Sequence, residues 1–360
     1  MIQVAVVGCG AAFRELHHPW LRLLERRGQI EVSALIDNDP KRAESLSREY
    51  KKARAFLSLS EAFQSVSAQL CIVASPPGFH KDHCIEALRG GSHVLCEKPL
   101  ATSLNEAKEM AAVSEASGRI LAVGMSRRFF PSVSEAAALI RNGKLGGNLE
   151  FVCREGGDYG WPVATDGPFR RQSSGGGVLI DRGVHVLDTL QALLGEPTLE
   201  SSFDDSFKDG VEANSLVWLR CGSARGSVQL SWENSYCNGL VVRGDSGALK
   251  LDSGDHLHYW HRTGNGGWLQ VRARQEWPQG VGVQSATALP ESYESCIYFE
   301  IVQVLRSVLL GEAYPVLAKD ALKVIGVIEE AYKRAQPLPA RWLPDTEQRL
   351  RVEKHWKSLQ

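Results

Sequence analysis

The sequence predicts an α/β protein with an N-terminal doubly wound parallel sheet and a C-terminal α/β domain built on a large open mixed or antiparallel sheet. Over the first third of the chain, short apolar runs alternate with patterns of helical periodicity, which is typical of parallel strands covered by helices on both faces. After Gly124, alternating aromatic-rich strand patterns follow one another, which favours a mixed or antiparallel sheet. We expect domains over 1–123 and 124–345 and a tail over 346–360.

In the first domain, the expected strands and helices alternate. The helical segments carry apolar residues at a spacing near 3.6, whereas the strands are short continuous apolar runs. The expected strands are Ile2 to Val7, Ile30 to Ile36, Leu70 to Ala74, His93 to Cys96 and Ile120 to Val123. The expected helices are Glu15 to Arg27, Pro40 to Lys51, Glu61 to Val66, His80 to Arg89 and Leu104 to Ser117.

The second domain is expected to open with a helix from Ser132 to Asn142, which Gly143 would end as a C-cap. Two helices, Tyr293 to Leu310 and Lys319 to Arg334, would close it, and the basic tail from Arg349 to Lys357 would form a solvated helix. Between them the expected strands are Asn148 to Arg154, Asn214 to Arg220, Ser227 to Trp232, Leu240 to Arg243, Ala248 to Leu251 and His256 to His261.

The composition limits the classes of molecule that this chain is expected to bind. It has 360 residues, 43% of them hydrophobic and 23% charged, and a formal net charge of -1, so it can build two domains with their own cores. That net charge gives no reason to expect nucleic acid or a membrane surface. The opening strand pattern carries no leader signal, and no apolar run approaches the length that spans a bilayer. We expect a cytoplasmic homodimer or homotetramer that binds small molecules.

The cysteines and one histidine cluster are the candidates for a metal site or a disulfide framework. Eight cysteines are scattered without a Cys-x-x-Cys pair, which predicts buried reduced thiols instead of a disulfide framework or a zinc site. His256 and His258 would project to one side of a strand with His261 nearby, a spacing that can bind a metal. Since no motif elsewhere supplies further ligands, we predict no metal site.

A glycine motif, Gly8-Cys9-Gly10, stands where the first strand would turn into the first helix. Glycines there let the backbone approach a pyrophosphate, and the helix N-terminus offers unpaired amides to its charge. Asp37 ends the second strand, where a carboxylate accepts hydrogen bonds from ribose hydroxyls and repels a 2′-phosphate. We therefore predict NAD as the cofactor, with NADP as the alternative because Lys41 and Arg42 follow closely.

The glycine fingerprint is incomplete at its third position. Phe13 stands there in place of glycine or alanine, the residues that permit close packing of the helix on the strand. A bare Gly-x-Gly also occurs in simple tight turns. Its place at the start of a βαβ unit, with Asp37 ending the next strand, favours a dinucleotide site.

Asp181 and His185 are the most informative pair in the chain. Residues four apart share one face of a helix, so this carboxylate and imidazole would point together at one site, and Lys98 would reach it from the other domain. Such a combination suggests proton chemistry in a cleft beside a cofactor. The alternatives are that the tripeptide Glu97-Lys98-Pro99 only ends a strand, that Asp181 caps a helix, and that His185 is a satisfied core histidine.

An ordered set of motifs gives the chain a family resemblance. From residue 1 to about Ala335 it resembles the glucose-fructose oxidoreductase, inositol dehydrogenase and rhizopine catabolism (Gfo/Idh/MocA) family. The motifs are Gly8-Cys9-Gly10 with His17 and Pro19, the turn Ser75 to His80, the run Gly91 to Leu100, the segment Arg128 to Pro131, and the segment Gly175 to Asp188.

The resemblance implies a Rossmann domain followed by an α/β domain whose open sheet often mediates dimers or tetramers. It also implies oxidation or reduction of sugars, cyclitols and related polyols with a nicotinamide cofactor, with Lys98 against the reacting oxygen and Asp181 and His185 completing the polar site. The predicted cofactor-binding residues are Gly8, Gly10, Ala11, Ala12, Phe13, Asp37, Ser75, Pro76, His80, Glu97 and Lys98. The predicted substrate-binding residues are Lys98, Arg128, Tyr159, Trp161, Arg170, Asp181 and His185.

The chemistry of these side chains agrees with such roles. Transfer of a hydride from a carbinol carbon leaves a hydroxyl proton that needs an acceptor, and histidine is suited to accept it near neutral pH. His185 would be the general base. Lys98 would supply positive charge where alkoxide character develops, and Asp181 would orient the imidazole or hold a substrate hydroxyl.

Specificity is expected in the segment 156–172, just before the glycine triplet at 175–177. Its aromatic residues could stack on a sugar ring while Arg170 and Asp158 bind hydroxyls, or the segment could be a surface loop whose tryptophan packs on its own domain. Arg127 and Arg128 could instead bind a carboxylate, which leaves an acidic sugar open.

We expect a dehydrogenase acting on a secondary hydroxyl, or on the matching ketone. The alternatives are a redox-neutral glycosidase that oxidises its sugar transiently with bound NAD, and a nucleotide-sensing regulator without turnover.

Overall fold

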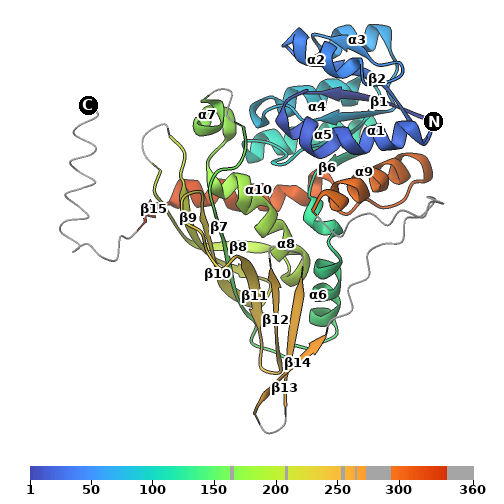
Figure 1. Ribbon diagram of the computed structural model, residues 1–360. Helices are drawn as coiled ribbons and strands as arrows, with labels where there is room; N and C mark the ends of the chain where they lie inside the picture. The colour runs from blue at the N-terminus through green and yellow to red at the C-terminus, as the bar shows by residue number, and fades with distance from the viewer. Residues whose placement is uncertain (163–165, 207–209, 253–255, 264–265, 273–292, 339–360) are drawn as a thin grey trace, which may run out of the picture.

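The computed structural model describes residues 1–162, 166–206, 210–252, 256–263, 266–272 and 293–338. The helix expected from Arg349 to Lys357 lies outside the described residues. Two sheets organise the described part of the chain, one in each half, with helices packed around both (Figure 1).

The first sheet is parallel throughout and has the strand order β3-β2-β1-β4-β5-β6. This is a doubly wound Rossmann sheet, as predicted. Its strands are β1 (Ile2–Val7), β2 (Ile30–Ile36), β3 (Arg54–Phe56), β4 (Leu70–Val73), β5 (His93–Cys96) and β6 (Leu121–Val123). Its helices are α1 (His18–Arg26), α2 (Pro40–Ser47), α3 (Leu59–Ser65), α4 (His80–Arg89) and α5 (Leu104–Ser117).

Side chains of β1 alternate between two hydrophobic cores, as the two-residue period of a strand requires. Val4 and Val6 belong to one core with α1 and Tyr298, and Ala5 and Val7 belong to the other with α4 and α5. The second core continues into the C-terminal half of the chain. The two halves are therefore joined by continuous packing.

The second sheet is mixed, with the strand order β14-β13-β12-β11-β7-β10-β9-β8-β15. The pairs β7–β10 and β8–β15 are parallel and the others antiparallel, which confirms the predicted fold class. The strands are β7 (Glu150–Gly156), β8 (Pro197–Asp204), β9 (Asn214–Cys221), β10 (Ala224–Ser231), β11 (Gly239–Arg243), β12 (Gly247–Asp252), β13 (Leu257–Arg262), β14 (Trp268–Arg272) and β15 (Gln336–Pro337).

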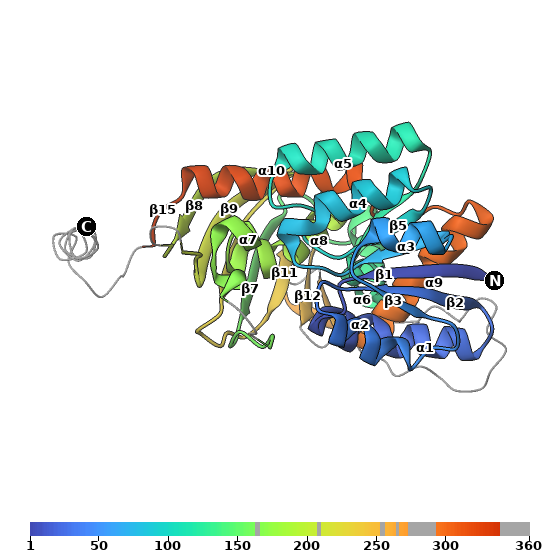
Figure 2. The ribbon, with the colours of Figure 1, turned by 90° about the horizontal axis from the view of Figure 1, so that it is seen from above.

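The helices after β6 link the two sheets. They are α6 (Pro131–Arg141), α7 (Arg171–Ser174), α8 (Val184–Leu194), α9 (Tyr293–Leu310) and α10 (Ala318–Arg334). Figure 2 shows α10 running beside α5 of the first domain, while α10 also packs on β8. Although α9 comes late in the chain, its Tyr298 ring packs 5.5 Å from Trp20 of α1, so α9 covers the Rossmann sheet.

The structure differs from the predicted elements where polar or short segments form strands. The predictions missed β3, β8, β14 and β15: β3 has three residues with an exposed arginine at its start, and β8 begins at Pro197 and carries polar side chains at its centre. Such segments have no continuous apolar run and pair as strands only because a neighbouring strand supplies hydrogen bonds. The helix expected from Pro40 to Lys51 ends at Ser47.

Of the eight cysteines, seven are buried, Cys237 is exposed, and all are free thiols. The predicted reduced thiols are thus present, although not all of them are buried. None of the described helices is both long and apolar enough to cross a membrane.

Candidate active site

The glycine loop after β1 is packed on one side and open on the other. Gly8 has φ +93°, and a Cβ on it would lie 2.4 Å from the backbone nitrogen of Ser75, so glycine is required there. A Cβ on Gly10 would meet nothing within 4 Å. The backbone at Gly10 therefore has room for close approach of a phosphate, which fits a bound dinucleotide.

The Asp37 carboxylate fixes the same loop. One of its oxygens accepts a hydrogen bond from the Cys9 amide and the other from the Asp39 amide, both at 2.8 Å. Asp37 is 8% exposed and sits at the carboxyl edge of the sheet, as the ribose prediction requires. Ala11 and Ala12 are partly exposed beside it.

Phe13 changes the start of the first helix. Its side chain is fully buried, and the chain forms a π-helical turn over Phe13–His17 before α1 begins at His18. The predicted α-helix from Glu15 is therefore wrong in its first turn. The wider turn coincides with the bulky side chain at a position where close packing normally requires glycine or alanine.

The turn after β4 carries three of the predicted cofactor residues. The Ser75 hydroxyl lies 2.9 Å from His83 Nδ1, Pro76 precedes a short 3-10 turn at Pro77–Phe79, and the His80 ring is buried. Ser173 in α7 approaches this turn so closely that a Cβ on Gly78 would lie 2.9 Å from its carbonyl oxygen. The C-terminal domain thus covers the rim of the cofactor site.

Lys98 and Asp181 meet across the two domains. The Lys98 ammonium donates to the Asp181 carboxylate at 2.7 Å and to the Asp181 backbone carbonyl at 3.0 Å. Lys98 follows β5, whereas Asp181 lies in a π-helical turn, Leu179–Gly183, that runs directly into α8. Asp181 therefore does not cap a helix, and the structure brings the two predicted residues together.

Glu97 and His17 form a buried pair behind Lys98. The His17 Nε2 atom lies 2.6 Å from the Glu97 carboxylate, and neither side chain is more than 9% exposed. Burial by itself would raise the pKa of Glu97, but His17 and the charge of Lys98 outweigh it and lower that pKa. The carboxylate also accepts the Lys98 backbone amide at 3.2 Å, so it orients the turn that carries Lys98.

His185 lies one turn after Asp181 in α8 and is 7% exposed. Burial, and then the positive charges of Lys98 and Arg127, hold its pKa well below the ordinary range. The ring is therefore neutral at physiological pH and can accept a proton. Its buried Nδ1 atom makes no hydrogen bond to the described residues.

A buried carboxylate, Glu212, holds the start of the helix that carries Asp181 and His185. Its side chain accepts hydrogen bonds from the Gly177 amide at 3.0 Å and the Leu179 amide at 2.8 Å, and from the Tyr332 hydroxyl at 2.9 Å. Burial raises the pKa of Glu212 to about 6, although these donors act in the opposite direction. A Cβ on Gly177 would lie 1.9 Å from the Glu212 carbonyl oxygen, which accounts for glycine there.

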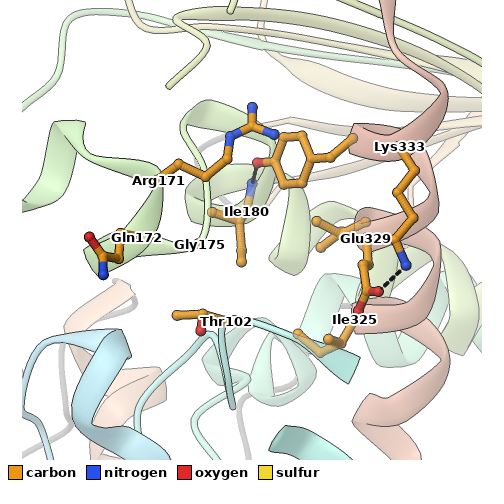
Figure 3. Close-up of a pocket in the computed structure, with 10 residues that line it drawn as sticks. Thr102, Arg171, Gln172, Gly175, Ile180, Ile325, Glu329 and Lys333 are labelled. Carbon is orange, nitrogen blue, oxygen red and sulfur yellow. Dashed lines mark hydrogen bonds and ion pairs between the residues drawn. The ribbon is translucent and has the colours of Figure 1, made fainter. Parts of the chain in front are cut away.

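A cavity of about 520 Å³ lies on the other side of the same turn. Figure 3 shows Ile180 pointing into it toward Thr102, while its backbone amide is hydrogen-bonded to the Tyr332 hydroxyl. The Arg171 guanidinium stacks on the Tyr332 ring at 4.6 Å. Because Ile180 faces this cavity and Asp181 faces Lys98, the turn separates the cavity from the Lys98–Asp181 pair.

Three aromatic rings form a wall beside the pair. Tyr159 packs 4.9 Å from Trp232 and 5.2 Å from Phe169, measured between ring centroids. Burial raises the pKa of Tyr159, and the charges of Asp181 and Lys98 act on that pKa in opposite directions. The surface-loop alternative, which concerns the tryptophan of this segment, stays open.

Three arginines predicted or considered as substrate-binding residues form ion pairs with neighbouring carboxylates. Arg128 binds Asp188 through two hydrogen bonds of 2.7 and 2.8 Å, and Arg127 donates to Glu155 at 2.9 Å. Arg170 donates to Asp166 at 2.6 Å, on the surface. Trp161 is partly exposed next to the gap at 163–165.

Among the described residues, no group of three or more His, Cys, Asp or Glu side chains is arranged to hold a metal ion. His256 and His258 both lie near Asp252, at 3.2 and 3.5 Å, and the His258 ring stacks on Trp260.

Sequence reasoning missed Glu212, Tyr332 and Trp232. A lone glutamate between strand patterns carries no local signal, and Tyr332 has the helical spacing of a core residue. Trp232 follows β10 directly and was predicted only as a strand residue. Its position at a strand end in the half of the chain that carries Asp181 was the one available indication.

The fold and the site together define an oxidoreductase with a dinucleotide-binding domain. A model of the "Oxidoreductase family, NAD-binding Rossmann fold" matches residues 2–125, and a model of the "GFO/IDH/MocA C-terminal domain" matches residues 133–250. The chain belongs to the GFO/IDH/MocA family of NAD(P)-binding oxidoreductases, which confirms the resemblance.

Similar proteins span different shares of the chain. D-Glucoside 3-dehydrogenase of Escherichia coli (strain K12) is 30% identical over 210 residues, 58% of this chain and 58% of that protein. The scyllo-inositol 2-dehydrogenase (NADP(+)) of Bacillus subtilis (strain 168) is 25% identical over 262 residues, 70% of this chain and 76% of that protein. The structure of a levoglucosan dehydrogenase with NADH and levoglucosan superposes with a TM-score of 0.80 at 19% identity, covering 92% of this chain and 98% of that one.

The buried Glu212 carboxylate gives a first prediction. Glu212→Gln presents an amide nitrogen to the Gly177 or Leu179 amide, so at least one buried donor loses its acceptor. We expect a loss of about 1–3 kcal/mol in the free energy of unfolding and a fall in catalytic rate, measured by urea unfolding and by oxidoreductase assay. Glu330→Gln, on the exposed face of α10, is the matched control. Equal stability of the two variants would contradict the positioning role.

Proposed function

We propose that this protein oxidises a secondary hydroxyl of a sugar, cyclitol or sugar derivative with NAD, or reduces the matching ketone. The contact of Lys98 with Asp181, next to a neutral and buried His185, carries the proposal. When bound, the nicotinamide accepts or supplies the hydride. The side chains described above bind the substrate, transfer its proton and stabilise the charge on its oxygen.

The proton and the charge of the reacting oxygen are handled by two of these side chains. His185 has a depressed pKa, so it is unprotonated at neutral pH and takes the hydroxyl proton during oxidation. The Lys98 ammonium stabilises negative charge on the oxygen as the proton leaves. Asp181 holds the ammonium with two acceptors, its carboxylate and its carbonyl, and so sets its direction.

The substrate class follows from the wall beside the pair. Tyr159 and Phe169, which pack on the buried Trp232, present aromatic surface next to polar groups, a combination suited to the apolar face and the hydroxyls of a sugar ring. The names of the relatives support this class, since they refer to a glucoside, an inositol and levoglucosan. An acidic sugar is less favoured as substrate, because the Arg128 guanidinium that could bind its carboxylate is already paired with Asp188.

The first test is absorbance at the reduced-nicotinamide band, with NAD or NADP and a panel of sugars, cyclitols and sugar acids. We expect a substrate-dependent rise with a neutral polyol, and His185→Ala should lower kcat by about 10²–10⁴-fold while NAD binding is retained. Cofactor binding without net reduction on any substrate would favour the redox-neutral glycosidase or the sensor. Full kcat in the variant would remove His185 from the base role.

The Asp37 carboxylate yields a prediction on cofactor choice. Asp37→Ala removes the charge that repels a 2′-phosphate and the acceptor for ribose hydroxyls, so kcat/KM for NAD should fall relative to NADP by about tenfold. The ratio of the two values is the measurement, because loosening of the loop at Cys9 affects both cofactors. An unchanged ratio would contradict the ribose assignment.

We also propose that the open face of the second sheet joins two copies of the chain. Strand register places Trp218, Ser227, Val152 and Val241 in one row across four strands, and the row exposes 46% of Trp218, 45% of Val152 and 39% of Val241. Helices α8 and α10 pack near the opposite face. An exposed apolar row of this kind is typical of a protein interface.

Substitution in the centre of this row tests the interface. Trp218→Asp places a charge on the face, so the molar mass in solution, measured by light scattering, should fall from a dimer or tetramer toward the monomer. Leu309→Asp, at an apolar residue of α9 that is 62% exposed, is the control and should leave the mass unchanged. A wild-type monomer would exclude the proposal.

A further inference from the structure

The hydrogen bonds of His80 define its protonation state. The ring is 1% exposed, with Nδ1 at 2.8 Å from the Pro99 carbonyl oxygen and Nε2 at 2.7 Å from the Ser75 carbonyl oxygen. A backbone carbonyl can only accept a hydrogen bond. Both ring nitrogens must therefore carry a proton, since a neutral ring would turn a lone pair toward one carbonyl oxygen. Such a doubly protonated imidazole carries a full positive charge.

The two carbonyl groups belong to two different parts of the site. Ser75 lies in the turn after β4 that covers the glycine loop, whose Gly8 packs against the Ser75 backbone. Pro99 directly follows Lys98 in the turn after β5. His80 stands at the first position of α4 and bridges these turns, so its ring sets their separation.

We propose that His80 is a positioning residue whose doubly protonated ring clamps the cofactor turn to the turn that carries Lys98. Its buried ring and its two occupied nitrogens argue against the direct cofactor contact expected from sequence. The consequence for catalysis rests on the proposed function, whereas the protonation state does not.

The surroundings of the ring support a cation. Burial by itself lowers the pKa of His80, but the Cys96 side chain on β5 and the two carbonyl groups outweigh it and raise that pKa to about 9. Burial would raise the pKa of Cys96, yet the Cys84 thiol on α4 and His80 bring it down to about 6. The remaining ionisable groups that act on these side chains are His83, Cys71 and Glu97. Among these ionisable groups, Cys96 most favours the charged ring, and its Sγ atom also lies 3.3 Å from the Glu97 carbonyl oxygen.

The sign of the pH dependence follows from the raised pKa. Below pH 6.5 the stabilisation from His80 is fully present, and it is lost as the pH rises through about 9. Above that pH the neutral ring loses one donor and the two turns are no longer held together. Cofactor affinity should fall over the same range.

The direct test is ¹⁵N NMR of the histidine rings in the full-length protein. At pH 8, where an ordinary histidine is neutral, we expect a doubly protonated ring whose signal is absent from His80→Gln and present in the exposed-site control His256→Gln. If His80→Gln does not fold, Cys96→Ser serves instead, because removal of the thiol that raises the pKa of His80 should shift the titration of this ring to lower pH. A neutral His80 ring at pH 8, or an unshifted titration in Cys96→Ser, would overturn the proposal.

The functional arm measures NAD binding by fluorescence from pH 7 to 10. In the wild type the Kd should rise about tenfold above pH 9, the size expected for loss of one charge-assisted hydrogen bond. In His80→Gln the Kd should be higher than in the wild type and constant with pH. A merely structural role of His80 would raise the Kd but leave its pH dependence in place. A wild-type Kd that stays constant to pH 10 would overturn the clamp. If the His80 ring is cationic but the protein turns over no polyol, the proposed function is rejected and the protonation state of His80 stands.

Discussion

The hydrogen bonds from Lys98 to Asp181 connect the two halves of this protein, and the geometry of the site depends on them. Lys98 follows strand β5 of the parallel sheet, and Asp181 lies in a turn of the second domain. A buried carboxylate fixes the backbone next to each partner. Glu97 accepts a hydrogen bond from the Lys98 amide, and Glu212 accepts hydrogen bonds from two backbone amides that precede Asp181. A buried carboxylate is costly unless its oxygens are hydrogen-bonded, so these networks leave each turn little freedom.

Charges around the site also separate the roles of its side chains. Two cations near His185 and its burial keep that ring neutral, which suits a proton acceptor. His80, equally buried, is surrounded by acceptors and has the opposite protonation state. His80 and His185 thus have different charge states, because the groups around the two rings differ.

The predicted elements were recovered where hydrophobic periodicity was strong. The strands at Ile2, Ile30 and His93 and the helices at His80 and Leu104 begin where the apolar pattern begins. The strand at Pro197 and the short strand at Arg54 were missed, since their pairing is supplied by neighbours distant in sequence. For the site, Asp181 and His185 could be proposed from their spacing, but Glu212 and Tyr332 reach this turn from remote segments that no local pattern connects.

The sequence by itself determined the fold class, the family and the identity of the three polar groups, because strand alternation, glycine turns and i, i+4 spacing are local properties. Only the tertiary structure decided which of those groups touch, which are charged and which are already bound. Arg128 illustrates this, since its guanidinium is taken by Asp188. Protonation and hydrogen bonding depend on what surrounds a side chain in space, and those surroundings come from parts of the chain that lie far apart along it.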